Sequence, residues 1–325
     1  MQKYKSFQQI VDAYIVEKRS IGLKFDKGAQ VLRRIVALQM QLDRGVPLLS
    51  RKTVETWTEK TPWESEVNRS HRICIIRGLG KYMVRMGYTA YIVPDRLAPF
   101  QDYIYAPYIF SDKELGLLLA SVDALCKQTP SEHASLVFPL LFRMLVGCGL
   151  RITEALSIEK QDVDLENGTL LLLNAKNKKE RIVPMAYSLC EACRKYAFNI
   201  QLVRGANKSQ YFFPNPEGKA YIASTAYSRF RQALWFAGIS HGGRGRGPRL
   251  HDLRHTFAVR VLNKWVREGK DLTTALPYLS VYMGHVGLKA TQHYLKLTAE
   301  MFPELIKTVE ETYGWVIPEA YHERD

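Results

Sequence analysis

Residues 250–294 read LHDLRHTFAVRVLNKWVREGKDLTTALPYLSVYMGHVGLKATQHY, and this stretch organises the rest of the chain. His251 and Arg254 are three positions apart, so on a helix they share a face and can reach one small target together. An imidazole that can exchange a proton, placed beside a permanently charged guanidinium, suits a phosphate group.

The glycines on either side of His285, Gly284 and Gly287, predict a break between two helices. Such a break would let His285 and the later Tyr294 fold back toward the same point as the first pair. We therefore expect two histidines, an arginine and a tyrosine to converge on a phosphate. Neutralising that phosphate calls for a second cation from elsewhere in the chain.

The composition indicates an intracellular protein. The chain has 325 residues, enough for two domains. Because it carries no apolar run of transmembrane length and no signal-peptide pattern after Met1, we expect a soluble, cytoplasmic protein with no membrane partner. Five cysteines fit a reducing compartment. Cys190 and Cys193 form a CxxC pair, but no second pair lies at zinc-ligand spacing, so we favour helical packing for them and expect no metal.

The net charge of +14 points to a polyanionic partner. Residues 1–100 hold 18 Lys and Arg against 9 Asp and Glu, a surplus of nine, whereas the remaining 225 residues carry a surplus of five. A small basic domain joined to a nearly balanced larger one is typical of nucleic-acid binding. An anionic membrane surface is the alternative, and no terminal amphipathic helix with bulky apolar anchors supports it.

Apolar residues recur at helical spacing in the first hundred residues, and the last predicted helix there covers 67–87. This helix should bury one apolar face and present Arg77, Lys81 and Arg85 as a basic stripe on another. We interpret the stripe as a contact to the DNA backbone, with a plain solvated face as the alternative.

Residues 91–108 carry three prolines among aromatic residues and predict an interdomain linker. The sequence Ser-Asp-Lys-Glu at 111–114 is a capping box, so a helix begins directly after it. A second long helix, from about Ser131 to Val146, is apolar enough for a core and ends where Gly-Cys-Gly forces a sharp turn.

Arg151 is the first residue after this turn and lies at the start of the next helix. An arginine fixed there can donate a bidentate pair to a phosphate, and Glu154, one helical turn later, can orient it. An ordinary surface pair of Arg151 and Glu154 is the alternative.

Strands are predicted at 170–173 and 181–184, joined by the basic hairpin tip 174–180. A lysine on such a tip can reach into a site and deliver a proton to a leaving oxygen. Spacing alone leaves Lys178 and Lys179 open for this task as well as Lys176.

Helices are predicted over 186–197 and 224–237, followed by the glycine-rich run 241–249. The freedom of a glycine backbone suits a loop that closes on DNA phosphates. Its contacts would be Arg244, Arg246 and Arg249; a plain mobile loop is the alternative.

In chain order these candidates form a set that resembles the tyrosine site-specific recombinase, or phage integrase, family over about residues 110–300. Gly-Leu-Arg-x-x-Glu at 149–154, Lys-Glu-Arg-x-Val-Pro at 179–184 and His-x-Leu-Arg-His at 251–255 match it in order and interval. Met-Gly-His at 283–285 stands where the family has Leu-Gly-His, and Tyr294 follows nine residues later.

Alignment on the strand that ends at Pro184 implies that Lys176 is the family's hairpin lysine, which protonates the departing 5′ oxygen. Ala175 and Asn177 replace glycines that are common in the family beside this lysine. The resemblance implies no cofactor and no small-molecule substrate.

The resemblance also implies a reaction in which the hydroxyl of Tyr294 attacks a DNA phosphodiester and forms a 3′-phosphotyrosine. Arg151, Arg254 and His285 would neutralise the nonbridging oxygens. His251 would accept the proton of Tyr294, whose pKa of about 10 makes it a poor nucleophile otherwise.

The implied fold is mainly α with a small antiparallel β-sheet. A helical, SAM-like core-binding domain at 1–90 and an α+β catalytic domain at 109–300 would form a C-shaped clamp on DNA, with 91–108 as the linker. The C-terminal helix and tail at 301–325 would dock on a neighbouring protomer. Four protomers, copies of this chain or a mixture with related recombinases, would hold two double-stranded DNA duplexes at a specific site in the nucleoid.

The favoured function is therefore a site-specific recombinase for DNA integration, excision or transposition. Because the sequence shows no long extra N-terminal arm-binding domain, we expect a simple recombinase or a transposon enzyme. A type IB topoisomerase shares this chemistry, but His251 stands where such enzymes usually carry lysine. The other alternative is a DNA-binding protein of the same fold that does not cut, although all six catalytic residue types are present.

Overall fold

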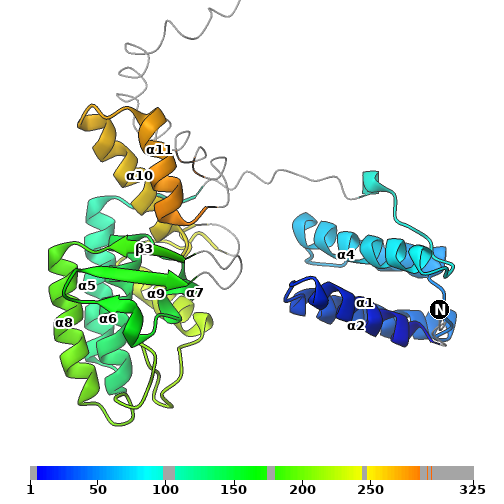
Figure 1. The fold of residues 1–325 in the computed structure, drawn as a ribbon, viewed down its shortest axis with the longest axis horizontal. Helices are drawn as coiled ribbons and strands as arrows, with labels where there is room; N and C mark the ends of the chain where they lie inside the picture. The colour runs from blue at the N-terminus through cyan, green and yellow to red at the C-terminus, as the bar shows by residue number, and fades with distance from the viewer. Residues whose placement is uncertain are drawn as a thin grey trace, which may run out of the picture. The chain divides into compact units, whose positions relative to one another are not determined.

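The computed structural model describes residues 6–97, 107–173, 180–243 and 247–285, together with Thr291 and Tyr294. The chain divides into two compact units between residues 105 and 106 (Figure 1). Within the described residues, no helix is both long enough and apolar enough to cross a membrane.

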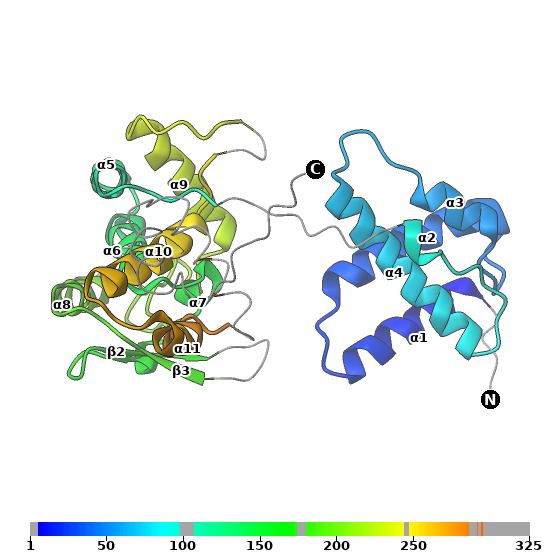
Figure 2. The same cartoon turned by 90° about the horizontal axis from the view of Figure 1, so that it is seen from above.

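The first unit is a bundle in which α4 packs against each of the three preceding helices (Figure 2). The sequence predicted that this last helix buries one apolar face. The prediction is confirmed, because four residues of α4 are at most 1% exposed: Ile73, Ile76, Leu79 and Met83. The elements of this unit are α1 (Phe7–Ser20), α2 (Asp26–Asp43), α3 (Arg51–Thr58), α4 (Glu66–Arg85) and the 3₁₀ helix η1 (Asp95–Leu97).

Residues 91–97, which we assigned to the linker, pack on this first unit. The backbone of Leu49 bonds to Thr89 and Tyr91 on both sides of a short parallel bridge, which leads the chain back along the bundle. Val93 is consequently 1% exposed within the core of the unit. The rest of the predicted linker, 98–106, lies outside the described residues.

Serine side chains start five of the helices that the structure describes. Each serine oxygen accepts the backbone N–H three residues later, which satisfies one of the donors that a helix N-terminus leaves unpaired. The capping box predicted at Ser111 and Glu114 is confirmed in full. The other serine caps are Ser6, Ser50, Ser65 and Ser131.

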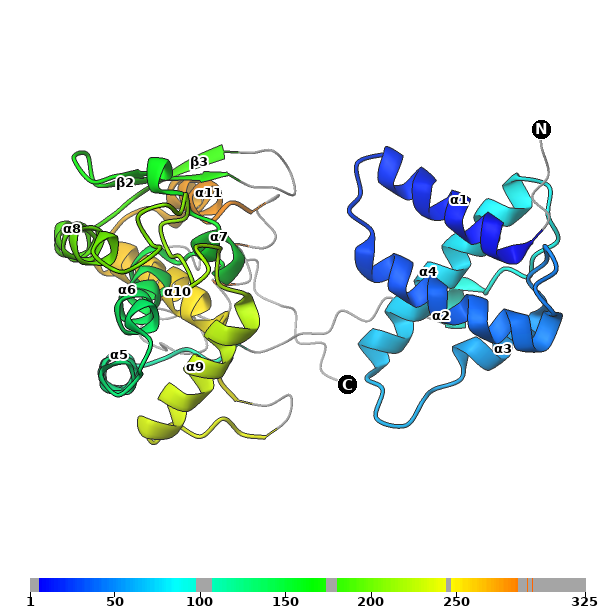
Figure 3. The same cartoon turned by 90° about the horizontal axis from the view of Figure 1, so that it is seen from below.

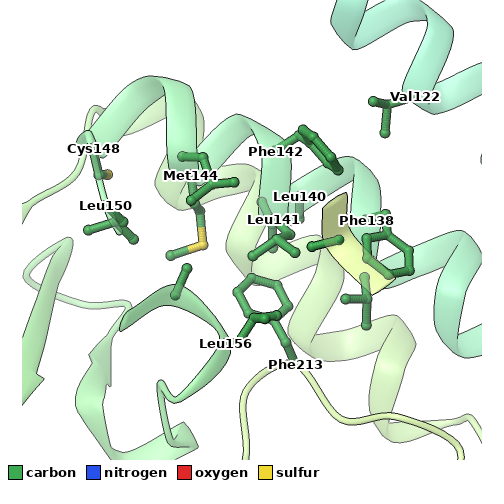
Figure 4. Close-up of a cluster of buried hydrophobic side chains, with 14 of the residues drawn as sticks. Val122, Phe138, Leu140, Leu141, Phe142, Met144, Cys148, Leu150, Leu156 and Phe213 are labelled. Carbon is green, nitrogen blue, oxygen red and sulfur yellow. The ribbon is translucent and has the colours of Figure 1, made fainter. Parts of the chain in front are cut away.

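The second unit is built around α6, which contacts α5, α8 and α10 and carries most of the central side chains (Figures 2 and 4). Phe138 and Phe142 are at most 1% exposed, and Phe213 packs with them in the same cluster. Each such buried side chain contributes about 1.5–3 kcal/mol to stability. The helices of the unit are α5 (Asp112–Lys127), α6 (Glu132–Cys148), α7 (Ile152–Leu156), α8 (Tyr187–Gln201), α9 (Ala223–Phe236), α10 (Asp252–Arg267) and α11 (Leu272–Met283), with the 3₁₀ helix η2 (Lys160–Asp162).

Three antiparallel strands in the order β1-β2-β3 form the sheet: β1 (Val163–Asp164), β2 (Thr169–Leu173) and β3 (Glu180–Pro184). The register pairs Leu170 with Val183, and these two side chains face the core. Helix α11 packs against β3 (Figure 3). The two predicted strands and the predicted fold class, mainly α with a small antiparallel sheet, are confirmed. The hairpin tip 174–179 lies outside the described residues.

Candidate active site

Arg254 lies at the centre of the candidate site, in the first turn of α10. It is 2% exposed, and its Nη1 donates to the carbonyl oxygen of Gly149 at 2.7 Å. Its Nη2 donates to the carbonyl of Met283 and lies 3.3 Å from Nε2 of His285. Burial, together with the nearby charge of Arg151, lowers the pKa of Arg254 to about 10, so the group remains a cation at neutral pH.

The carbonyl of Gly149 can face Arg254 because the chain turns sharply at the end of α6. Gly149 has a φ of +60°, a left-handed conformation that favours glycine. A Cβ atom at this position would lie 2.4 Å from the ring of Phe257. The Gly-Cys-Gly turn predicted from the sequence therefore brings α6 and α10 into close contact at the site.

Arg151 lies at the N-cap of α7, where Glu154 holds it. The backbone N–H of Arg151 donates to Oε2 of Glu154 at 2.9 Å, and its Nη1 donates to Oε1 at 2.6 Å. The Nη2 of Arg151 reaches the carbonyl oxygen of Gly284 at 3.1 Å. This side chain is 32% exposed, so it retains surface for an external anion.

Glu154 also binds Arg181, a residue that the sequence analysis did not assign to the site. Arg181 donates to both carboxylate oxygens, at 3.2 and 2.8 Å, and Nη1 of Arg254 lies 4.0 Å from Oε2. Burial by itself raises the pKa of Glu154, but hydrogen bonds from Arg181 and from the Arg151 backbone bring it down to about 2. Glu154 is thus a permanent anion among three cations.

His285 follows the C-terminus of α11, where Gly284 adopts a left-handed conformation. The Nδ1 of His285 lies 2.8 Å from Oγ1 of the fully buried Thr291. Burial, and then the charges of Arg254 and Arg151, lower the pKa of His285 to about 4. The ring is therefore neutral at pH 7.

Tyr294 is 3% exposed and lies among these groups. Its ring stacks on His285 with centroids 5.9 Å apart and contacts the ring of His255 at 5.4 Å. Burial raises the pKa of Tyr294, while the charges of Arg254 and Arg151 act in the opposite direction. The hydroxyl is accordingly protonated at neutral pH and needs a base.

His251 lies at the N-cap of α10, and its ring packs edge-on against His255 at 4.8 Å. The residue is exposed to solvent, although protein atoms surround much of its ring. This burial of the ring, with the charges of Arg254 and Arg151, lowers its pKa to about 4. The ring of His255, a residue to which the sequence assigned no role, contacts both His251 and Tyr294.

The structure thus brings together Arg151, Glu154, Arg254, His285 and Tyr294, with His251 at the edge of the group. Lys176, Arg244 and Arg246 lie outside the described residues. Arg249 is exposed, and its backbone N–H donates to Oδ2 of Asp252 at 2.7 Å, which fixes the chain just before α10.

The prediction of an exposed basic stripe on α4 is wrong for Arg77. Arg77 does not present its charge to solvent, because its side chain is 12% exposed and donates to the carbonyls of Val93 and Pro94, both at 2.9 Å. The returning segment 91–97 covers it. Arg85 pairs with Glu17, and Lys81 is exposed.

Cys190 and Cys193 pack within α8. Both are buried, and Sγ of Cys193 lies 3.9 Å from Sδ of Met185 in the core. The helical packing that we favoured for this pair is confirmed. No cluster of three or more His, Cys, Asp or Glu residues suited to a metal ion occurs in the part of the chain that the structure describes.

The sequence and the fold match known proteins. Residues 116–301 match the model of the phage integrase family. The protein y4rB of Sinorhizobium fredii, named as an integrase/recombinase, is 28% identical over 310 residues, which cover 95% of this chain and 98% of that protein. The tyrosine recombinase XerD of Corynebacterium glutamicum is 28% identical over 72% of this chain and 71% of its own length.

Solved structures share the fold at low identity. The integrase of transposon Tn1549, in complex with a circular intermediate DNA, has a TM-score of 0.61 at 16% identity and covers 90% of this chain and 95% of that one. The XerH recombinase bound to its palindromic difH substrate has a TM-score of 0.59 at 21% identity, covering 82% and 71% respectively.

The chain belongs to the phage integrase family. It is a site-specific DNA recombinase, an enzyme that cleaves and rejoins DNA strands. Because the relatives reported above are recombinases and integrases, the topoisomerase alternative is not favoured.

Proposed function

We propose that Tyr294 is the nucleophile of this recombinase and that Arg151, Arg254 and His285 bind the phosphate it attacks. The observation that carries this proposal is the meeting of these groups from separate parts of the chain. Arg254 contacts the turn at Gly149, 105 positions upstream, and Nε2 of His285, 31 positions downstream. The ring of Tyr294 stacks on that same histidine.

The chemical step forms one bond and breaks one bond. The oxygen of Tyr294 bonds to phosphorus as its proton passes to His251, whose low pKa leaves the imidazole neutral and able to accept it. The bond from phosphorus to the 5′ oxygen breaks, and Lys176 donates a proton to that oxygen. Reversal of the step by the 5′ hydroxyl of another strand rejoins DNA without an external energy source.

His285 changes its role when DNA arrives. A guanidinium group has no acceptor, so in the DNA-free protein Nε2 of His285 accepts from Arg254 and Nδ1 carries the proton directed at Thr291. A phosphodiester brings negative charge to the site and raises the pKa of His285. The doubly protonated ring then donates from Nε2 to a nonbridging oxygen.

The assembly is also part of the proposal. Four protomers hold two DNA duplexes, and residues 301–325, which lie outside the described residues, dock on a neighbour. The integrase name of y4rB and the fold shared with a transposon integrase support a mobile-element enzyme. We place its work at the nucleoid, where its DNA substrate lies.

The test is to express the wild type and Tyr294→Phe in cells, purify each under denaturing conditions, and sequence the DNA that stays covalently attached. We expect adducts at a few discrete sites for the wild type and none for Tyr294→Phe. Adducts that persist in the variant would assign the nucleophile to another residue. Scattered adducts would instead indicate relaxation of supercoils.

A further inference from the structure

The C-terminus of α11 is held by three arginines. A helix end leaves its last carbonyl groups without partners inside the helix, and here three consecutive carbonyls each accept from a different guanidinium. The pairs are Arg181 Nε with Tyr282 at 2.9 Å, Arg254 Nη2 with Met283, and Arg151 Nη2 with Gly284 at 3.1 Å. The residue directly after these carbonyls is His285, so its position depends on the three arginines.

Arg181 differs from the other two because its donors are directed into the protein. Its side chain is 8% exposed, and its three nitrogens donate to Tyr282 and to both oxygens of Glu154. Arg151, by comparison, is 32% exposed. Arg181 is therefore placed to hold other groups and not to contact DNA.

The main group that Arg181 holds is the carboxylate of Glu154. This carboxylate also accepts from Arg151, and Arg254 lies 4.0 Å away from it. Without Arg181, the anion would keep these two cations as its only nearby partners among the described residues. Both cations would then be drawn toward Glu154 and away from a bound phosphate.

Close packing ties the same guanidinium to the turn before His285. A Cβ atom on Gly284 would lie 2.8 Å from Nη1 of Arg181, so the side chain lies directly against this backbone. Arg181 is also the second residue of β3, the strand that follows the hairpin tip with Lys176. One side chain thus joins β3 to α7 and to the end of α11.

We propose that Arg181 is a positioning residue of the recombination reaction. It acts through Glu154 and the Tyr282 carbonyl, and it keeps Arg151 and His285 in the geometry that the phosphate requires. This inference rests on the proposed roles of Arg151, His285 and Tyr294.

The first test uses the DNA-free protein and amide hydrogen exchange. The amides of Gly284 and His285 donate to Val281 and Ser280 at 2.9 and 3.0 Å, and their exchange reports on the turn. In Arg181→Met we expect their exchange to accelerate roughly tenfold or more, because the turn loses one of its three anchors. Unchanged exchange at these two amides would overturn the inference.

The matched control for this variant is Arg143→Met. Arg143 likewise binds both oxygens of a carboxylate, Asp123, at 2.7 and 2.6 Å and one backbone carbonyl, that of Pro139, at 2.9 Å. This pair joins α6 to α5. We expect Arg143→Met to leave amide exchange at Gly284 and His285 unchanged. Equal acceleration in Arg143→Met would show that the faster exchange in Arg181→Met reflects a general loss of stability, and it would overturn the inference.

The second test measures cleavage of a nicked duplex that carries the sequence captured by the wild type in cells. For Arg181→Met we expect DNA affinity within about twofold of the wild type and a single-turnover cleavage rate about 100-fold lower, as for displacement of catalytic groups. Arg181→Lys should keep an intermediate rate because it restores one donor and the charge. The double variant Arg181→Met, Glu154→Gln should recover part of the cleavage rate, because it no longer has a Glu154 carboxylate that draws Arg151 and Arg254 away from the phosphate.

The two proposals fail differently. A wild type that forms no adduct would reject the proposed function and, with it, the role of Arg181 in that reaction. If Arg181→Met cleaves as fast as the wild type, the positioning role is rejected and the proposed function stands. The same holds if the DNA affinity of Arg181→Met falls by as large a factor as its cleavage rate.

Discussion

The Nδ1 atom of His285 lies 2.8 Å from Oγ1 of Thr291, six residues later in the chain. Because Nε2 of the same ring faces a guanidinium that can only donate, the proton of the neutral ring belongs on Nδ1. Thr291, a buried hydroxyl without an obvious sequence signal, accepts that proton and so shares with Arg254 in fixing the tautomer of a candidate catalytic histidine.

Thr291→Val should free this tautomer. The buried N–H loses its acceptor, so we expect a loss of about 1–3 kcal/mol in the free energy of unfolding. The ¹⁵N chemical shifts of the His285 ring should report a mixture of tautomers. Thr291→Ser keeps the hydroxyl and should resemble the wild type; ring shifts that are identical in Thr291→Val would remove Thr291 from this role.

Stability should fall in mild acid because of the histidines. The pKa of His251 and of His285 is about 4 in the folded protein, below the ordinary value of 6.5. Between these values the unfolded chain binds more protons, so the stability present above 6.5 is lost as the pH falls toward 4. Urea denaturation at several pH values measures this.

The comparison for this prediction is His285→Gln, which should lose less stability on acidification than the wild type. Carboxylates with lowered pKa, such as Glu64 and Glu154, give a slope of the same sign, so the difference between the two proteins isolates the histidine. Parallel curves would show that the pKa of His285 is not depressed.

Arg254→Ala and Arg151→Ala should both abolish adduct formation but differ in stability. Arg254 is 2% exposed, and its removal leaves the carbonyl of Gly149 without this donor, so we expect a loss of about 3–5 kcal/mol. Arg151 is 32% exposed, and its loss should cost about 1–2 kcal/mol. Denaturant midpoints measure the difference, and equal midpoints would contradict it.

Lys81→Glu should weaken DNA binding and reduce its salt dependence. Lys81 is exposed on the basic first unit, and loss of one phosphate contact lowers the slope of log affinity against log salt by about 0.9. Lys195→Glu, an exposed lysine on α8, makes the same charge change and should leave binding unaltered. Equal losses in both variants would mean that only total charge matters.

Arg77 shows where periodicity misleads. Spacing along α4 predicted that Arg77 shares an exposed stripe with Lys81, but the segment at 93–95 returns over it and takes its hydrogen bonds. Helical spacing reports which residues share a face. It carries no information on whether a later segment covers that face.

Glu154 makes one contact that the sequence predicts and one that it does not. Its contact with Arg151 was predictable, because the two are three positions apart at a helix start. Its contact with Arg181, 27 positions later, was not, although the strand with Arg181 had been recognised. A strand pattern indicates which side chains face the core, and Arg181 reaches across to another element.

By itself, the sequence determined the helical segments, the capping box at Ser111 and Glu114, the strands β2 and β3, and the residue types and order of the candidate site. These depend on local periodicity, on capping and on motif spacing, all of which lie along the chain. Only the tertiary structure decided that Arg151, Arg181 and Arg254 all close on the end of α11, and that Thr291 orients His285. Most of those bonds end on backbone carbonyls, which every residue carries alike, so no residue type in the sequence marks them.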